Sequence, residues 1–388
     1  MDFSFNEEQQ QLQEAVSRFV RGDYGFAQRH AIVASPEGWS RTAWQGLADL
    51  GVLAINVPEA HGGLGFGPVE TALALQAAAP AMLCEPVLAS AVVATVLVRD
   101  AGDAAAQADL LPAMAAGERI VVVAHEEAAA RGEVRWVETR ARADGDGYLL
   151  DGRKAVVLHA AAADELIVSA RMSGAPGDAQ GVSLFRVPRD AAGMTVHSYP
   201  TIDGLRAADI ALDGVRLPAS ALLGAEGKGL PAVERAFGIG LAALCAEAVG
   251  TMQAMVDATV EYLKTRQQFG QPIGRFQALQ HRTADMLLHL EQARSMGYLA
   301  SIRCTDDDDT ERRRALSAAK VTVGQAARFI GQQAVQLHGG MGMTDELDVS
   351  HWFKRLLAVG TRFGDTDSHL QRFAALSRSP ATTALADE

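Results

Sequence analysis

The spacing of hydrophobic residues along the chain divides it into three parts. In the first part, apolar residues such as Leu12, Val16 and Phe19 recur at helical intervals. The second part alternates between apolar and polar residues in short runs, separated by turn sequences such as Asp144–Gly147, as β-hairpins do. In the third part the helical interval returns. The sequence therefore predicts a mainly α protein with a middle β domain, in the order helical domain (1–118), β domain (119–226) and C-terminal helical bundle (227–388).

The middle part is predicted to form a compact antiparallel sheet, closed as a barrel or stacked as a sandwich. Its apolar runs are short and are bounded by Gly and Asp, which is typical of strands joined by tight turns. The predicted strands are Ile120–Ala124, Val134–Thr139, Gly147–Leu150, Val156–His159, Leu166–Ser169, Gly181–Val187, Met194–Ser198 and Ile210–Val215.

Composition narrows the class of protein. The 388 residues are 48% hydrophobic and only 6% aromatic, and the net charge of −12 argues against nucleic acid or an anionic membrane as a partner. The three cysteines are scattered without metal-ligand spacing, as expected of reduced thiols in a cytoplasm. The longest apolar run, Val87–Val98, is too short to span a bilayer, and Met1–Ser4 shows no basic start of a targeting signal. We expect a cytoplasmic protein without a metal site.

The stretch 262–286 is the first candidate binding site. It is predicted to be a long helix that is interrupted by a glycine- and proline-containing turn at 270–274 and then resumes. Arg266 lies at the helix end, where a guanidinium can bind a phosphate through a fork of hydrogen bonds. Phe269 and Ile273 can flank a flat apolar group such as an adenine. The alternative is a purely structural helix hairpin.

A second candidate lies in the run 336–342, Gln-Leu-His-Gly-Gly-Met-Gly. Gly339 and Gly340 follow a predicted helix, and adjacent glycines let the backbone approach a ligand closely and offer N–H donors to an anion. The alternative is a helix C-cap. His338 is either a contact of the ligand or a packing residue.

These two runs resemble the acyl-CoA dehydrogenase family. The matching pattern is Arg-x-Gln-Phe-Gly-x-Pro-Ile, followed by Phe-Gln-x-x-x-His and Ala-Asp-Met, and then Gln-x-x-Gly-Gly, and similarity extends over nearly the whole chain. The resemblance implies a helical domain, a β domain and a four-helix domain, usually assembled as a tetramer with FAD across a subunit interface. It implies that one chain holds FAD with Arg266, Gln268, Phe269, Ile273 and Gln277, and that the neighbouring chain contributes Gln336, Gly339 and Gly340.

The family's reaction needs a carboxylate that removes the α-proton of an acyl thioester while the β-hydrogen leaves as hydride to the flavin. Such a base requires an apolar site that raises its pKa. Most members carry it as Glu in a Tyr-Glu-Gly-Thr run, and counting back from Gln371 and Arg372 puts Asp365 at that position. The alternative is that Asp365 or Asp367 is the N-cap of a helix that begins near Ser368.

The family's other base position, on the helix that opens the C-terminal domain, falls on Gly240 and is empty. Glu247 lies seven residues further along the same face, among small residues, and we rank it above Asp365. The alternative is a glutamate on the helix surface or at an interface. This stretch resembles a subfamily that includes heteromeric enzymes acting on bulky steroid-CoA thioesters.

The β domain departs from the family pattern. The usual Thr-Glu-Pro and Gly-Ser-Asp run, which touches the flavin, is replaced by residues 125–131, His-Glu-Glu-Ala-Ala-Ala-Arg, and the usual Trp after Lys154 is absent. The departure implies either a roomier pocket or a chain that only completes the FAD site of a partner.

Three hypotheses follow. The first is a FAD-dependent acyl-CoA dehydrogenase that acts on a bulky or unusual acyl-CoA in fatty acid or steroid degradation. An electron-transfer flavoprotein is its expected acceptor, and the assembly is a homotetramer or a heterotetramer with a second acyl-CoA dehydrogenase-like chain. The second is a non-catalytic partner subunit, and the third is a flavin monooxygenase-like relative.

Overall fold

The computed structural model describes residues 5–378 and contains two compact units. The helical unit takes the described residues up to Phe26, the segment Ala72–Leu83, and the described residues from Leu241 onward. The β unit takes Ala27–Thr71 and Cys84–Gly240. The sequence also predicts a frayed end from Ser379 onward, and this segment and Met1–Ser4 lie outside the described residues.

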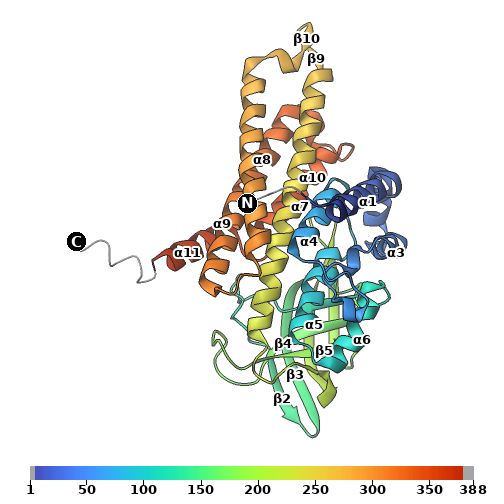
Figure 1. Cartoon of the computed structure of the whole chain (residues 1–388), viewed down its shortest axis with the longest axis vertical. Helices are drawn as coiled ribbons and strands as arrows, with labels where there is room; N and C mark the ends of the chain where they lie inside the picture. The colour runs from blue at the N-terminus through green and yellow to red at the C-terminus, as the bar shows by residue number, and fades with distance from the viewer. Residues whose placement is uncertain (1–4, 379–388) are drawn as a thin grey trace, which may run out of the picture. The chain divides into compact units, whose positions relative to one another are not determined.

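The helical unit is built around two long helices joined by a hairpin, as Figure 1 shows. The helix α7 (Leu230–Thr265) leads into the short strands β9 (Gln267–Gln268) and β10 (Gln271–Pro272), which turn the chain into α8 (Gln277–Arg303). The predicted break at 270–274 is therefore a two-stranded turn. The other helices of the unit are α1 (Glu7–Asp23), the later part of α4 (Pro68–Ala78), α9 (Asp309–His338), α10 (Asp348–Thr361) and α11 (Thr366–Ser377).

Close packing of small residues fixes α7 in this unit. A Cβ added to Gly250 would lie 2.5 Å from the carbonyl oxygen of Gln76 and 2.7 Å from the Ala79 side chain, so only glycine permits this approach to α4. By length and composition α7 could cross a membrane, but 89% of its most apolar window is buried inside the fold. Asp308, in the acidic loop before α9, is the N-cap of this helix, and its side chain accepts hydrogen bonds from the backbone of Thr310 and Glu311.

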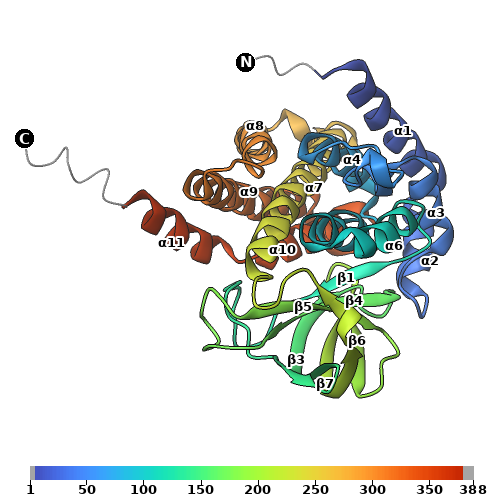
Figure 2. The same cartoon turned by 60° about the horizontal axis from the view of Figure 1, so that its bottom comes forward.

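The β unit holds a single eight-stranded sheet, shown in Figure 2. The order is β6-β7-β3-β2-β4-β5-β8, and β1 pairs with β4. Most neighbours are antiparallel, but β1 and β2 both run parallel to β4, so the prediction of a purely antiparallel sheet was wrong at these two pairings. The strands are β1 (Val121–Ala124), β2 (Arg140–Asp144), β3 (Gly147–Leu158), β4 (Glu165–Arg171), β5 (Val182–Pro188), β6 (Met194–Pro200), β7 (Arg206–Pro218) and β8 (Leu222–Leu223).

The helices of the β unit precede its sheet in the chain. They are most of α2 (Phe26–Ala34), α3 (Arg41–Asp49), an eight-residue π-helix (Val87–Ala94), α5 (Thr95–Ala101) and α6 (Ala104–Ala115). The π-helix contacts β1, where the Val121 amide donates to the Ser90 hydroxyl at 3.3 Å. The overall architecture confirms the prediction of a mainly α protein with a middle β sheet.

Two strand predictions were wrong. Gly147–Leu150 and Val156–His159 form one strand, β3, whose pairing with β7 shifts register at bulges between Leu150 and Gly152 and between Lys154 and Val157. Val134–Thr139 is not a strand, because side chains bind its backbone instead of a neighbouring strand. These side chains belong to the polar network described below.

Candidate functional site

The hairpin between α7 and α8 presents the first group of residues predicted to bind FAD. Arg266 is exposed, and its guanidinium makes no hydrogen bond or ion pair with any residue between 5 and 378. Phe269 is 89% exposed with a backbone φ of 55°, and its ring meets Phe276 edge-on at 5.9 Å. Gln268 and Gln277 are also exposed, and Ile273 is half-buried. An exposed aromatic ring in a left-handed conformation indicates a surface that is built to contact something else.

The second group lies where α9 ends. Gln336, Gly339 and Gly340 are exposed, and a Cβ added to either glycine would meet no atom of this chain within 4 Å. Gly339 has φ 59° and ψ −138°, a conformation that favours glycine. The turn therefore offers open backbone to an approaching group.

A ring stack brings these two groups to the same end of the helical unit. Tyr262, one turn before Arg266, stacks on His338 with centroids 4.4 Å apart, and its hydroxyl lies 3.4 Å from the His338 carbonyl oxygen. His338 is buried, and its Nδ1 lies 2.8 Å from the carbonyl oxygen of Ala334. Burial lowers the His338 pKa. A neutral packing histidine explains these contacts. Of the two roles considered for His338 from the sequence, ligand contact or packing residue, the geometry supports packing.

The residues of both groups fit FAD. A guanidinium without a partner in the described chain suits a pyrophosphate, an exposed ring suits a flat base, and open glycine backbone suits close approach of an anion. All of these residues except the half-buried Ile273 are exposed on this chain, as expected of a site that a ligand or a neighbouring subunit covers.

Glu247 lies inside the helical unit. It is 9% exposed, and its Oε1 accepts a hydrogen bond from Arg355 of α10 at 2.9 Å. The other terminal nitrogen of Arg355 donates to the carbonyl oxygens of Met82 and Leu83, at 3.3 and 3.0 Å. Glu247 is thus a buried carboxylate of α7 with one oriented oxygen.

Asp365 has a different environment. Its side chain accepts a hydrogen bond from the Ser368 amide at 2.7 Å and forms the N-cap of α11, which confirms the structural alternative for this residue. Hydrogen bonds from Ser368 lower the Asp365 pKa, and the residue is exposed. Asp367 lies in the first turn of the same helix. A solvated, hydrogen-bonded carboxylate is a weak base, so this geometry does not favour Asp365 as a proton acceptor.

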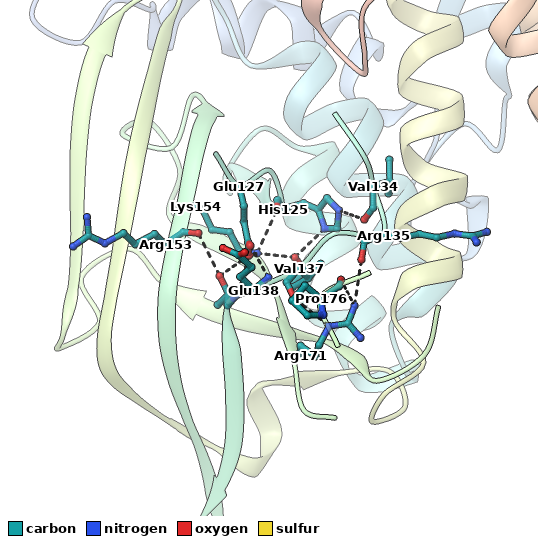
Figure 3. Close-up of polar contacts among 12 residues, drawn as sticks. His125, Glu127, Val134, Arg135, Val137, Glu138, Arg153, Lys154, Arg171 and Pro176 are labelled. Carbon is teal, nitrogen blue, oxygen red and sulfur yellow. Dashed lines mark hydrogen bonds and ion pairs between the residues drawn. The ribbon is translucent and has the colours of Figure 1, made fainter. Parts of the chain in front are cut away.

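The β unit contains a buried polar network centred on Lys154, drawn in Figure 3. The Lys154 ammonium donates to Glu127 Oε1 at 2.7 Å, to the Ser169 hydroxyl at 3.1 Å and to the His125 carbonyl oxygen at 3.2 Å. These three acceptors satisfy all three N–H bonds of the lysine. The His125 ring bridges Ser169 at 2.9 Å and the Val134 carbonyl at 2.8 Å, and it meets Phe237 edge-on.

Burial decides the charge states in this network. It lowers the His125 pKa to about 4 and the Lys154 pKa to about 8. Burial alone would raise the Glu127 pKa, but the Lys154 charge and hydrogen bonds outweigh it, and the net shift is downward. At neutral pH the histidine is neutral, with Nε2–H donating to the Val134 carbonyl oxygen, and the lysine and glutamate are both ionised.

The same network holds the segment that replaces the predicted strand at 134–139. Glu127 accepts from the Glu138 and Thr139 amides, at 2.6 and 3.0 Å. Arg171, which is fully buried, donates to carbonyl oxygens of two loops and has no carboxylate among its hydrogen-bond acceptors. Those oxygens belong to Arg135, Val137, Ser173, Pro176, Asp178 and Gln180.

The side chain of Glu126, unlike those of its sequence neighbours His125 and Glu127, is not bonded into this network. Its carboxylate makes no hydrogen bond or ion pair with any residue in the described part of the chain, and burial raises its pKa. Its backbone carbonyl accepts from Ala155, which precedes Val156, a 54% exposed residue with φ 54° in the β3 bulge. A β-branched residue with positive φ is strained, and strain of this kind clusters at functional sites.

Sequence reasoning missed Arg355, Arg171 and Glu126. A pairing across 108 residues, such as that of Arg355 with Glu247, leaves no local pattern. The sequence contains one indication of the β network. His125, Glu126 and Glu127 directly follow an apolar strand, and charged residues that are buried beside such a strand need partners.

Comparison with known proteins gives matches over the whole described length. The profile "Acyl-CoA dehydrogenase, N-terminal domain" matches residues 6–118, the middle-domain profile 123–215 and the C-terminal-domain profile 227–376. The probable acyl-CoA dehydrogenase YngJ of Bacillus subtilis (strain 168) is 30% identical, covering 93% of this chain and 96% of its own. The acyl-CoA dehydrogenase FadE12 of Mycobacterium tuberculosis is 30% identical, covering 97% and 95%.

Solved structures are similar over the same range. One described as a Tcur3481-Tcur3483 steroid ACAD variant has a TM-score of 0.86 at 29% identity and covers 97% of this chain and 99% of its own. A glutaryl-coenzyme A dehydrogenase bound to glutaryl-CoA has a TM-score of 0.88 at 25% identity, covering 96% of each chain.

Proposed function

Because the chain belongs to the acyl-CoA dehydrogenase family, we propose that it oxidises a bulky or unusual acyl-CoA thioester with Glu247 as the proton acceptor. Flavin-dependent dehydrogenation of acyl-CoA is the activity of this family, and FAD is its cofactor. When bound, FAD supplies the acceptor for the hydrogen that leaves the β-carbon with its electron pair.

The residues that we propose to hold FAD form the two exposed groups of the helical unit. In the first group, the Arg266 guanidinium binds the pyrophosphate, and Phe269 and Ile273 lie against the adenine, with Gln268 and Gln277 beside them. In the second group, Gln336 and the open backbone of Gly339 and Gly340 approach the same cofactor from a neighbouring subunit. The absence of internal partners for the Arg266 guanidinium within residues 5–378 supports this assignment.

One observation carries the choice of Glu247. Its carboxylate is buried, and Arg355 binds Oε1, while Oε2 makes no hydrogen bond with any residue between 5 and 378. A general base needs a position fixed by its surroundings and an oxygen that is open to the proton it removes. Asp365 suits this role less well, because it is exposed to solvent and its side chain already accepts the N-cap hydrogen bond of α11.

Two observations support a bulky acyl group and a heteromeric assembly. The relative at 29% identity is described as a steroid enzyme with two chain names. In addition, the family's usual Trp after Lys154 is replaced here by small and aliphatic residues, including the exposed Val156. We propose a homotetramer or a heterotetramer with a second acyl-CoA dehydrogenase-like chain, an electron-transfer flavoprotein as acceptor, and a cytoplasmic location.

A second candidate function is a non-catalytic subunit that completes a partner's FAD site. It is favoured by the β unit, where the segment that touches flavin in relatives is replaced by residues whose polar groups are largely bound within this chain, such as His125 and Glu127. Purification of the chain alone separates the two: a yellow protein that oxidises acyl-CoA supports the first function, and a colourless, inactive protein supports the second.

Replacement of the proposed base tests the assignment directly. The purified protein is assayed with butanoyl-CoA, octanoyl-CoA and cholanoyl-CoA and an artificial electron acceptor, and oxygen consumption is recorded to detect a monooxygenase-like activity. We expect cholanoyl-CoA to be the best of the three, Glu247→Gln to lower kcat by at least about 100-fold and Asp365→Asn to lower it less than about threefold. Normal turnover by Glu247→Gln rules out Glu247 as the base.

A further inference from the structure

We infer that Arg355 is a positioning residue for the proton acceptor: it clamps Glu247 between three segments of the helical unit so that only one carboxylate oxygen faces the acyl group. This inference rests on the proposed function of Glu247. It is supported by the hydrogen bonds of Arg355, whose side chain is buried, to Glu247, Met82 and Leu83, which all belong to the same compact unit.

The clamp joins three segments that are distant in the sequence. Arg355 comes from α10, Glu247 from α7, and the carbonyl oxygens of Met82 and Leu83 from the turn after α4. In the ion pair, the Arg355 and Glu247 side chains are 3% and 11% exposed. A planar guanidinium that donates to a carboxylate and to two carbonyls has one allowed orientation, and so does the carboxylate that it binds.

The turn that receives Arg355 is itself held in a strained conformation. Met82 has φ 52° and is 1% exposed, and a methionine adopts this left-handed conformation only when its surroundings impose it. Trp352, one helical turn before Arg355, donates from Nε1 to the Pro80 carbonyl oxygen at 2.9 Å. Two side chains of α10 therefore fix the same turn, but only Arg355 also reaches Glu247.

This arrangement suits proton abstraction. The hydrogen bond from Arg355 holds Oε1 in one orientation and leaves Oε2 as the oxygen that can take a proton. In the reaction, the Cα–H bond breaks and the proton passes to Oε2. Bound FAD would accept the β-hydrogen together with its electron pair, so the pair of the broken Cα–H bond would become the second bond between Cα and Cβ. Arg355 touches neither reacting carbon and acts through Glu247.

A purely structural ion pair is the competing explanation, and kinetics separate the two. The FAD-loaded protein is assayed with whichever of the three acyl-CoA compounds turns over fastest. A second measurement incubates that compound with the protein in D2O without an electron acceptor and follows deuterium uptake at the α-carbon by mass spectrometry, which reports proton transfer separately from steady-state turnover. The variants are Arg355→Met, Arg355→Lys, Glu247→Gln and the double variant Glu247→Gln/Arg355→Met.

The chain offers two matched controls. Trp352→Phe removes the other hydrogen bond between α10 and the turn but leaves Glu247 untouched. Lys354→Met removes a cation of the same helix whose ion pair with Asp345 is exposed. Neither control should change kcat or deuterium uptake by more than about threefold, because neither residue orients the carboxylate.

We expect Arg355→Met to lower kcat and deuterium uptake about 100-fold with KM within about threefold, and Arg355→Lys to recover about tenfold of that loss. The inference is overturned if Arg355→Met matches the Trp352→Phe control while Glu247→Gln is inactive, because the base then works without its clamp. If Glu247→Gln is fully active, the proposed base has failed, whatever Arg355→Met does.

Variants that do not fold would also decide the question. If Arg355→Met cannot be purified, Arg355→Lys supplies the kinetic test, since it keeps the charge but lacks the planar fork. The double variant removes the unpaired buried carboxylate and should refold to a melting temperature above that of Arg355→Met. Equal melting temperatures for these two variants would contradict the existence of the buried pair.

Discussion

Lys154 and Glu127 form an ion pair at 2.7 Å in which the two side chains are 0% and 4% exposed. This pair links β3 to the segment that follows β1, and Glu127 also accepts hydrogen bonds from the backbone of Glu138 and Thr139, so the pair holds the loop 134–139. Such a pair contributes more to defining one conformation than to net stability, because the cost of removing two charges from water offsets much of their attraction.

Loss of one partner of this pair should therefore be costly. Lys154→Met leaves Glu127 buried and unpaired, and we expect it to lower the free energy of unfolding by about 3–5 kcal/mol. Arg216→Met is the matched control, because its ion pair with Asp144 is 78% and 38% exposed and should contribute less than about 1 kcal/mol. Urea unfolding followed by circular dichroism measures both, and similar losses for the two variants would contradict a buried pair.

Arg171 should be equally sensitive to a conservative change. Arg171→Lys keeps the charge but cannot reach the carbonyl oxygens of both loops, including those of Val137 and Pro176. We expect a loss of at least about 3 kcal/mol, because several buried acceptors lose their donors. Hydrogen–deuterium exchange should increase in residues 133–139 and 173–181, with little change in α9. Unchanged protection in both loops would show that they do not depend on the guanidinium.

Local chemistry explains what the sequence could predict. The order of helical and β parts follows from hydrophobic periodicity, and the turn at 270–274 follows from its glycines and proline. The N-cap role of Asp365 was predicted in the same way, because an N-cap is defined within four residues. The motifs that indicated FAD lie in largely exposed segments, where packing within this chain does not dictate the residue types.

The errors came from contacts between distant residues. Val134–Thr139 has the composition of a strand, but Arg171 and Glu127 bind its backbone, so no neighbouring strand does. Prediction of the proposed base from the sequence was limited in the same way. Glu247 could be identified as an odd carboxylate among small residues, whereas its partner Arg355 lies 108 residues away with no pattern to connect the two.

Two buried histidines should make the protein sensitive to acid. Burial lowers the pKa of both His125 and His369 to about 4, below the ordinary 6.5. Between pH 6.5 and 4 the unfolded chain therefore binds more protons than the folded protein. The contribution of these two histidines to the free energy of unfolding is fully present above about pH 6.5 and is lost as the pH falls towards 4. The loss is on the order of 3 kcal/mol for each histidine.

Variants identify the histidine that is responsible. His369 receives the Ser317 hydroxyl at Nδ1 and donates from Nε2 to the Phe363 carbonyl oxygen, so His369→Gln should flatten the fall in unfolding free energy between pH 6.5 and 4. The exposed His281 is the control, and His281→Gln should leave the slope unchanged. The measurement is urea unfolding at half-unit pH steps. The same slope in the wild-type protein and in His369→Gln would show that His369 is protonated in the fold.

The strongest test of the FAD site uses a glycine whose replacement costs the fold nothing. A Cβ at Gly340 would meet no atom of this chain within 4 Å, so Gly340→Ala should leave the melting temperature of the FAD-free protein within about 2 °C of wild type. A methyl group there would nevertheless stand between the backbone and an approaching cofactor, and we expect FAD affinity to fall about tenfold or more. Arg266→Gln should weaken binding at least as much, because it removes the only charge proposed to face the pyrophosphate.

Gly360→Ala in α10 is the matched control, since its Cβ also meets nothing within 4 Å and it lies in neither FAD group. FAD titration followed by flavin fluorescence measures all three. If Gly340→Ala binds FAD as the Gly360→Ala control does, the open turn after α9 does not contact the cofactor, and the Arg266 hairpin must hold it with other residues.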